Sequence, residues 1–179
     1  MAKENINDGK QQEGHGEGFI QLNKQKTLEE VLLVAASFEK VAYEFYTSLI
    51  PKVSKNIRYL VEELADEELQ HYDLFNGLRD DENVLEQLQE RIKIPKEDQN
   101  FLNYTHLPDL QDNMDDQSVL QYALGREDSA MKQYQELAEN TPDGSLKSVF
   151  QFLAYEETQH KRELEKKYYE LIHSGGPGN

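Results

Sequence analysis

The sequence of 179 residues contains no cysteine, which removes several classes of function at once. A disulfide framework, a thiolate-ligated zinc or iron–sulfur site and a thiol nucleophile all need cysteine side chains. A chain of this length can bury a core large enough for one ordinary domain without covalent cross-links. Candidate chemistry therefore rests on side chains that offer oxygen and nitrogen.

Long hydrophobic runs are also missing. The longest aliphatic run spans residues 31–36, whereas a membrane-spanning helix needs about 20 apolar residues. The first ten residues, MAKENINDGK, contain no apolar segment of the kind found in secretory signals. We expect a soluble, cytoplasmic protein with no membrane partner.

Basic residues are scarce: 19 Lys and Arg stand against 35 Asp and Glu, and the formal net charge is -16 at pH 7. Binding to a nucleic acid backbone relies on clustered Lys and Arg side chains that release counterions. The charge therefore argues against a nucleic acid partner and suits a cationic one. Solubility alone is the plainer explanation of the acidity.

Apolar residues are nearly absent from residues 1–26. This segment is predicted to be a disordered polar tail, because it cannot bury enough surface to offset the entropy of ordering. The last six residues, 174–179, read SGGPGN and are predicted to be a flexible C-terminal tail. Residues 27–173 carry helical periodicity and form one predicted domain.

Four helices are predicted in this domain. Thr27 followed by Glu30 is a capping-box pattern ahead of an apolar run, so the first helix is expected to start there. Ser54 and Ser145 are further predicted starts, and Gly77 is the predicted end of the second helix. The predicted helices are 27–49, 54–77, 116–140 and 145–173.

Connection lengths predict the topology. Short connections join the first helix to the second and the third to the fourth, so each pair is predicted to form an antiparallel hairpin. The hairpins are joined by residues 78–115, with a short helical candidate at 82–92. That length lets the third helix start parallel to the second. One long crossover is typical of a ferritin-like four-helix bundle, which is an all-α fold.

The pattern Glu-x-x-His occurs twice, at residues 68–71 and 157–160. Residues three apart share one face of a helix, so each motif offers a carboxylate and an imidazole to one point in space. A glutamate stands about thirty residues before each motif, Glu39 before the first and Glu127 before the second. The matched spacing predicts that the two hairpins are repeats of one unit.

Six side chains are predicted to meet near the middle of the bundle. Four buried carboxylates are too costly unless something neutralises them, and two divalent cations carry the matching charge. A mixed nitrogen and oxygen set suits iron or manganese, and zinc is a further candidate. Glu–His pairs that face solvent are the alternative. The predicted metal ligands are Glu39, Glu68, His71, Glu127, Glu157 and His160.

No metal-binding role is predicted for the other polar candidates. His15, His106 and His173 are predicted to be exposed. Tyr46 and Tyr134 are predicted to pack in the core, with a hydrogen bond to the site or a redox role as the alternative. No catalytic residue is predicted beyond the metal ligands. Four side chains lie one step off the ligand face and are not assigned as ligands: Glu67, Gln70, Glu156 and Gln159.

At these residues the chain resembles the rubrerythrin-like branch of the ferritin-like di-iron carboxylate proteins, over residues 27–173. The resemblance implies that the six residues hold a carboxylate-bridged centre of two iron ions. It also implies oxidation of iron with reduction of peroxide or dioxygen. Two features depart from the family: without cysteine there is no rubredoxin module, so an electron donor would be a separate protein. Leu124 stands where rubrerythrins carry a second helix-three glutamate.

The leading functional prediction is an oxidoreductase of the ferroxidase or peroxidase type. An iron-binding, storage or metal-handling protein without catalytic turnover is the alternative, and a helical protein without metal is the third. Bundles of this kind often assemble as homodimers, so a homodimer is kept beside a monomer. The motifs specify the metal site better than they specify the reaction.

Overall fold

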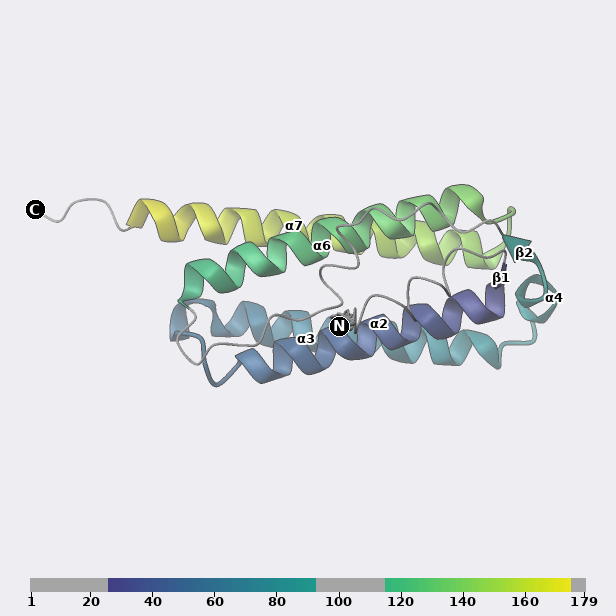
Figure 1. Ribbon diagram of the computed structural model, residues 1–179, viewed down its shortest axis with the longest axis horizontal. Coiled ribbons are helices and arrows are strands. Elements are labelled where there is room, and N and C mark those ends of the chain that lie inside the picture. The colour runs from purple at the N-terminus through teal and green to yellow at the C-terminus, as the bar shows by residue number, and fades with distance from the viewer. Residues whose placement is uncertain (1–25, 93–114, 175–179) are drawn as a thin grey trace, which may run out of the picture.

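Four long helices form the body of the computed structural model, which describes residues 26–92 and 115–174. They are α2 (Leu28–Leu49), α3 (Lys55–Arg79), α6 (Asp116–Asn140) and α7 (Ser145–Ser174). Figure 1 shows two layers, in which α2 packs beside α3 and α6 beside α7. The two predicted hairpins of an all-α bundle are therefore present.

The helix starts follow from capping side chains. Thr27 accepts a hydrogen bond from the Glu30 backbone N–H at 3.2 Å, and the Glu30 carboxylate accepts one from the Thr27 N–H at 3.0 Å. This reciprocal pair is the predicted capping box. Ser54 accepts from the Asn56 N–H at 3.1 Å and caps α3.

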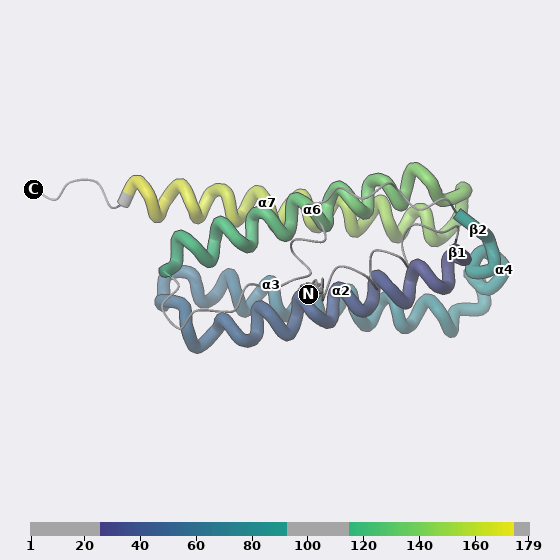
Figure 2. Tube along the Cα trace, viewed as in Figure 1, coloured from purple at the N-terminus to yellow at the C-terminus, as the bar shows by residue number. Residues whose placement is uncertain are grey.

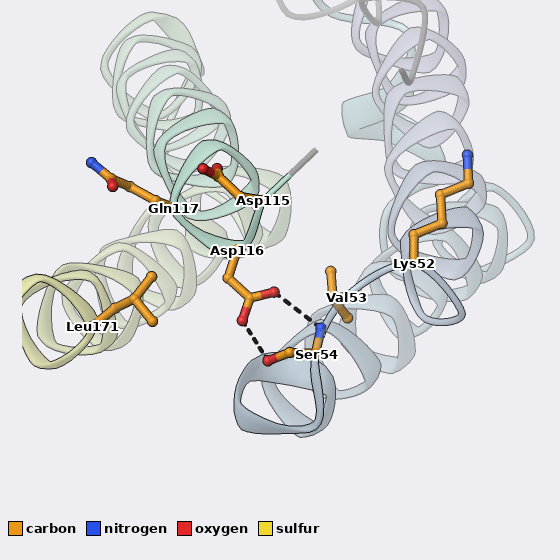
Figure 3. Close-up of a pocket in the computed structure, with 7 residues that line it drawn as sticks. All are labelled: Lys52, Val53, Ser54, Asp115, Asp116, Gln117 and Leu171. Carbon is orange, nitrogen blue, oxygen red and sulfur yellow. Dashed lines mark hydrogen bonds between the residues drawn. The ribbon is translucent and has the colours of Figure 1, made fainter. Parts of the chain in front are cut away.

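The third long helix starts at the same end of the bundle as the second. Asp116, in the first turn of α6, accepts a hydrogen bond from the Ser54 backbone N–H at 3.0 Å and another from the Ser54 hydroxyl (Figure 3). The chain trace in Figure 2 shows α3 and α6 running in the same direction, with α2 and α7 running the opposite way. This is the parallel arrangement that the long crossover predicts.

The predicted end of the second helix at Gly77 is wrong. The helix continues to Arg79, and Asp80 is its C-cap. A Cβ atom at position 77 would meet nothing within 4 Å, so glycine is not needed there for space. Leu78 packs against the apolar core, and this contact favours one further half-turn of helix.

The crossover begins with a shorter helix than predicted. In place of a helix over 82–92, the chain forms α4 (Leu85–Leu88) and the two-residue strand β2 (Arg91–Ile92). β2 pairs antiparallel with β1 (Lys26–Thr27), with Lys26 opposite Ile92 and Thr27 opposite Arg91. The start of the crossover is thereby tied to the start of α2. The remaining predicted crossover and tail segments lie outside the described residues: 1–25, 93–114 and 175–179.

The apolar core consists of two clusters. The first, near α4, contains Leu28, Phe75 and Phe150, and the second, near the α2–α3 turn, contains Phe45 and Ile57. Full burial of each such side chain contributes about 1.5–3 kcal/mol relative to exposure. Buried glutamates and histidines lie in the same helices at heights between the two clusters. The polar layer is thus held in place by apolar packing on both sides.

Polar residues occupy many of the exposed positions on the helices, beside exposed apolar side chains such as Leu33 and Phe152. On α2, for example, Ser37, Lys40 and Glu44 are exposed on the side opposite the core. This pattern is that of helices that bury one stripe and solvate the other. Within the described ranges, none of the helices is both long enough and apolar enough to span a bilayer.

Candidate metal centre

All four long helices contribute to one buried polar cluster. The six predicted ligands are each at most 5% exposed, although carboxylates and imidazoles usually lie at the surface. Glutamate comes from every helix, and histidine comes from α3 and α7. The contributing residues are Glu39 on α2, Glu68 and His71 on α3, Glu127 on α6, and Glu157 and His160 on α7.

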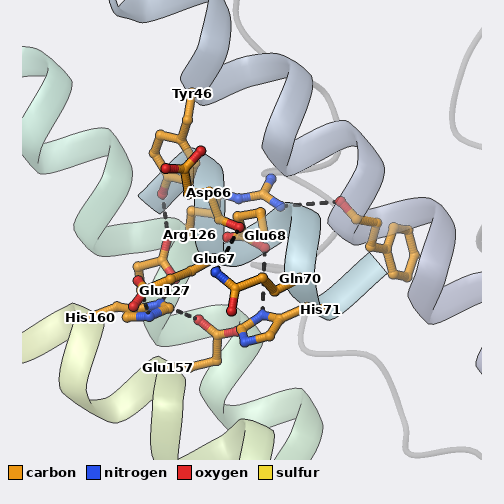
Figure 4. Close-up of polar contacts among 11 residues, drawn as sticks. Tyr46, Asp66, Glu67, Glu68, Gln70, His71, Arg126, Glu127, Glu157 and His160 are labelled. Carbon is orange, nitrogen blue, oxygen red and sulfur yellow. Dashed lines mark hydrogen bonds and ion pairs between the residues drawn. The ribbon is translucent and has the colours of Figure 1, made fainter. Parts of the chain in front are cut away.

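The cluster divides into two groups that share Glu157. In each group, one nitrogen or oxygen atom from every residue lies within 4.8 Å of the corresponding atoms of the others. In the second group, His160 Nδ1 lies 3.2 Å from Glu157 Oε2 and 3.5 Å from Glu127 Oε2 (Figure 4). The structure therefore brings all six predicted residues together. The groups are Glu39, Glu68, His71 and Glu157, and Glu127, Glu157 and His160.

Several atoms of the cluster are buried without a hydrogen-bond partner. They include Glu68 Oε2, His71 Nδ1, Glu127 Oε2 and Glu157 Oε1. His71 Nδ1 lies 3.6 Å from Glu157 Oε1 and 4.0 Å from Glu68 Oε2, too far for a hydrogen bond. Buried polar atoms are almost always satisfied, and a cation among these atoms would satisfy them together. The residues present therefore fit a metal site.

Burial strongly perturbs the protonation of the cluster. It raises the pKa of Glu39 to about 7 and holds the pKa values of Glu68 and Glu157 well above the ordinary range. Burial also opposes ionisation of Glu127, but interactions with His160 and Glu157 lower its pKa to about 2. Without metal, protons therefore take over part of the neutralisation that cations would provide.

The two histidines differ in their electrostatic surroundings. Burial and the neighbouring His160 lower the pKa of His71 to about 4. Burial acts in the same direction on His160, but contacts with Glu127, Glu157 and Glu67 outweigh it and raise the pKa of His160. In the absence of metal, His160 is thus the positive member of the pair, and His71 is neutral.

Arg126 is a buried cation that sequence reasoning missed. Its Nη2 donates a hydrogen bond to the Phe38 carbonyl oxygen at 3.4 Å, and its guanidinium carbon lies 6.0 Å from the centre of the Tyr46 ring. Burial disfavours the charged guanidinium, but the attraction of Glu68 and neighbouring acidic groups raises the pKa of Arg126. The sequence signal that could have indicated this residue is its position directly before Glu127.

Glu67 also contributes to the site, although it is not among the predicted ligands. Its Oε2 lies 2.8 Å from His160 Nε2 and its pKa is lowered by that contact, so Nε2 faces Glu67. His160 Nδ1 is then left facing Glu127 and Glu157. A carboxylate on the far nitrogen is the usual way in which proteins orient a metal-binding imidazole.

The tyrosines only partly follow the prediction. Tyr46 is fully buried, as predicted, but its hydroxyl also donates a hydrogen bond to Glu127 Oε1, which was the less favoured alternative. Tyr134 packs against the rings of Phe75 and Phe150 and is a core residue, as predicted. Matching positions in the two repeats therefore have different roles.

The remaining candidates lie away from the cluster or cannot be placed. His173 is exposed near the end of α7, where its Nδ1 lies 2.8 Å from the Tyr169 carbonyl oxygen. Gln70 is exposed and donates to the Asp66 carbonyl oxygen at 3.3 Å. Glu156 and Gln159 are half-buried on α7 and are not members of either group. His15 and His106 lie outside the described residues.

Comparison with known proteins agrees with this geometry. Residues 118–174, which contain α6 and α7, match the rubrerythrin family model. The structure is similar to that of a protein from Thermotoga maritima described as a ferritin-like diiron-carboxylate protein, with a TM-score of 0.62 and 21% identity. The alignment covers 82% of this chain and 97% of the other. No curated protein matches the chain at a significant level.

The fold and the cluster together define a ferritin-like helical bundle with a carboxylate and histidine set that fits a metal site. Within that class, the second hairpin of this chain is similar to rubrerythrins, since the family model matches residues 118–174. The family match contains one glutamate from the upstream position and one complete Glu-x-x-His motif, Glu127 with Glu157 and His160. The other three residues, Glu39, Glu68 and His71, lie outside that match and are placed in the cluster by the structure.

Proposed function

We propose that this chain binds two iron ions at the six-residue cluster and reduces hydrogen peroxide or dioxygen there. The observation that carries the proposal is the pair of overlapping groups around Glu157, in which buried oxygen and nitrogen atoms lack hydrogen-bond partners. The match to the rubrerythrin family supports it, as does the similarity to a protein described as a diiron-carboxylate protein.

The donor set determines how metal would be held. Glu39, Glu68 and His71 would serve one ion, Glu127 and His160 the other, and Glu157 would be common to both. Four carboxylates match the charge of two divalent cations, which removes the cost of burying four anions together. Nitrogen and oxygen donors without thiolates favour iron or manganese.

Bound ferrous iron would supply one electron from each of two ions, and with two protons these electrons convert hydrogen peroxide into two water molecules. The protein's part is to position the ligand side chains and to isolate the site from bulk water. Tyr46 donates to Glu127 Oε1, and Glu67 holds the far nitrogen of His160. The apolar clusters on either side limit access of bulk water. Since the chain has no cysteine, we propose a separate redox protein as the electron donor.

The test compares the wild-type protein with Glu157→Gln, because Glu157 belongs to both groups. Glu156→Gln is the matched control, one residue away and outside both groups. Elemental analysis after growth with iron should find about two iron ions per chain in the wild type and the control. In Glu157→Gln the iron content should fall.

Turnover distinguishes the proposed function from its alternative. Repeated consumption of peroxide in the presence of a chemical reductant supports an oxidoreductase. A single stoichiometric round of iron oxidation, with no further turnover, supports an iron-binding or storage protein instead. Failure of the wild-type protein to take up any divalent metal under anaerobic conditions contradicts both.

A further inference from the structure

Arg126 reaches the metal cluster from α6 without being one of its predicted ligands. Its side chain lines a small cavity together with Glu39 and Glu68. Figure 4 shows it on the side of the cluster where Tyr46 and Glu68 lie, and its guanidinium carbon is 6.0 Å from the centre of the Tyr46 ring. Its Nη2 donates to the Phe38 carbonyl oxygen at 3.4 Å. A positive charge is thus held beside the carboxylates by a backbone contact.

The charge of Arg126 acts on three carboxyl groups of the cluster. Burial is the largest influence on the pKa values of Glu39, Glu68 and Glu127, and it opposes their ionisation. Attraction to the Arg126 guanidinium acts in the other direction on all three. A guanidinium stays protonated in proteins, so this charge is permanent. Because Arg126 is half-buried and its Nε atom is buried, solvent screens the charge only in part.

A charge count shows what this arrangement favours. The four buried carboxylates of the cluster match the charge of two divalent ions. Arg126 adds one positive charge, and Glu67, which contacts His160 at the edge of the cluster with a side chain 34% exposed, adds one negative charge. With two divalent ions the site is therefore close to neutral. Each trivalent ion in place of a divalent one adds a positive charge that Arg126 repels.

We propose that Arg126 sets the charge preference of this site, favouring divalent over trivalent ions through its permanent positive charge. The inference rests on the proposed function, in which each ferrous ion passes one electron to peroxide and becomes trivalent. Arg126 raises the free energy of that oxidised state, so an external one-electron donor returns the ion to the divalent state more easily. The same preference works against retention of ferric iron, as a storage role would require.

The binding test uses two redox-inert ions, zinc as the divalent ion and gallium as the trivalent one. Arg126→Met removes the charge, Arg126→Lys keeps it, and Arg162→Met is the control at an exposed arginine of α7. Competition with nitrilotriacetate measures both affinities. In Arg126→Met the ratio of zinc affinity to gallium affinity should fall about tenfold, the effect of one unit charge on another across partly screened protein. Arg126→Lys and the control should keep the wild-type ratio.

The reduction potential of the iron-loaded protein is a second readout that does not depend on turnover. In Arg126→Met the midpoint potential should fall by about 60 mV, which is a tenfold change for one electron. If this variant does not fold, Arg126→Gln, which is also neutral, takes its place in both measurements. An unchanged affinity ratio or an unchanged potential in a folded neutral variant would overturn the proposal. So would an equal loss in Arg126→Lys, because the charge is still present there.

The binding test also separates failure of this inference from failure of the proposed function. If the ratio of zinc to gallium affinity depends on the charge at position 126, but the iron-loaded wild type does not consume peroxide repeatedly, the charge preference stands and the proposed reaction is wrong. If the wild type turns over peroxide, but the ratio is the same in Arg126→Met, the reaction stands and the role of Arg126 is overturned.

Discussion

Glu67 and Glu156 each stand one residue before the glutamate of a Glu-x-x-His motif, but they behave differently. Glu67 Oε2 lies 2.8 Å from His160 Nε2. Within the described part of the chain, Glu156 makes no such contact with His71. The two repeats therefore offer a comparison in which sequence position is matched and the carboxylate contact with the histidine is present in one repeat and absent from the other.

We expect Glu67→Ala to weaken divalent metal binding about 10–100-fold, because an orienting carboxylate behind an imidazole ligand contributes on that scale. Glu156→Ala should leave the affinity unchanged. Glu67→Gln should restore part of the loss, since the amide oxygen still accepts from His160 Nε2. Competition with a coloured chelator measures the affinities. Equal losses in the two alanine variants would contradict the positioning role of Glu67.

Arg126 supplies a buried positive charge that interacts with Glu68, and we expect its importance to depend on whether metal is present. Without metal, Arg126→Met leaves the carboxylates less compensated and should cost about 1–3 kcal/mol of unfolding free energy. With two divalent ions bound, the loss should be smaller, because the ions already neutralise the cluster. Urea unfolding with and without zinc measures both values.

The control for this comparison is Arg162→Met, an exposed arginine on α7 whose loss should change neither value by more than about 0.5 kcal/mol. If Arg126→Met costs the same in both forms, Arg126 stabilises through packing and its hydrogen bond to the Phe38 carbonyl oxygen rather than through its charge. Its electrostatic role would then be refuted.

At this scale, the sequence predicted which residues meet but not how they are supported. Helical spacing places Glu68 and His71 on one face, and that is enough to bring them to the cluster. The contacts of Glu67, Arg126 and Tyr46 cross between helices and depend on side-chain rotamers and on the register of neighbouring helices. A single sequence does not contain that information directly.

At the scale of elements, α4 is joined to the α6–α7 turn through Gln87. The Gln87 side chain accepts a hydrogen bond from the Leu146 N–H at 3.0 Å and donates one to the Pro142 carbonyl oxygen at 3.3 Å. A Cβ atom on Gly144 would lie 2.2 Å from Gln87 Nε2. Glycine at this position therefore leaves room for the contact between the crossover and the second hairpin.

We expect Gly144→Ala to displace the Gln87 amide and to cost about 1–2 kcal/mol through two lost hydrogen bonds. In a Gln87→Ala background the same change should be neutral or slightly stabilising, because the clash is gone and alanine reduces the entropy of the unfolded chain. A double-mutant cycle by thermal unfolding measures the coupling. Additive effects would show that the two residues do not interact.

Helix starts were predicted more accurately than the crossover, for a physical reason. Thr27 and Ser54 cap their helices through hydrogen bonds to residues two or three positions away, so the signal is local. The β1–β2 pairing joins segments more than sixty residues apart with two residues on each side, and no local pattern reveals it. The end at Gly77 failed because tertiary packing of Leu78 overrides the preference of glycine for helix ends.

At the scale of the whole molecule, the cluster is where the two hairpins are joined by chemistry as well as by packing. The first group contains residues from both hairpins, whereas the second group comes from α6 and α7 alone, and Glu157 belongs to both groups. Glu157 of α7 meets His71 of α3 across the bundle at 3.6 Å. Bound metal should therefore act as a clamp between the two halves of the fold.

We expect removal of metal to lower the unfolding temperature substantially. A ligand at 1,000 times its dissociation constant stabilises by about 4 kcal/mol, which for a chain of this size corresponds to about 8–16 °C. Glu157→Gln should lose most of this increment, because the variant removes the residue that belongs to both groups. Scanning calorimetry of zinc-loaded and chelator-treated protein measures it.

The clamp has a further consequence that separates it from simple binding within one hairpin. If metal joins the halves, its removal should speed amide hydrogen exchange in both α3 and α7, since His71 of α3 and Glu157 of α7 belong to the same group. If metal is held by α6 and α7 alone, exchange should change in those helices and not in α2 and α3. Protection that changes in only one hairpin would therefore refute the bridging role of Glu157, even where the unfolding temperature falls as expected.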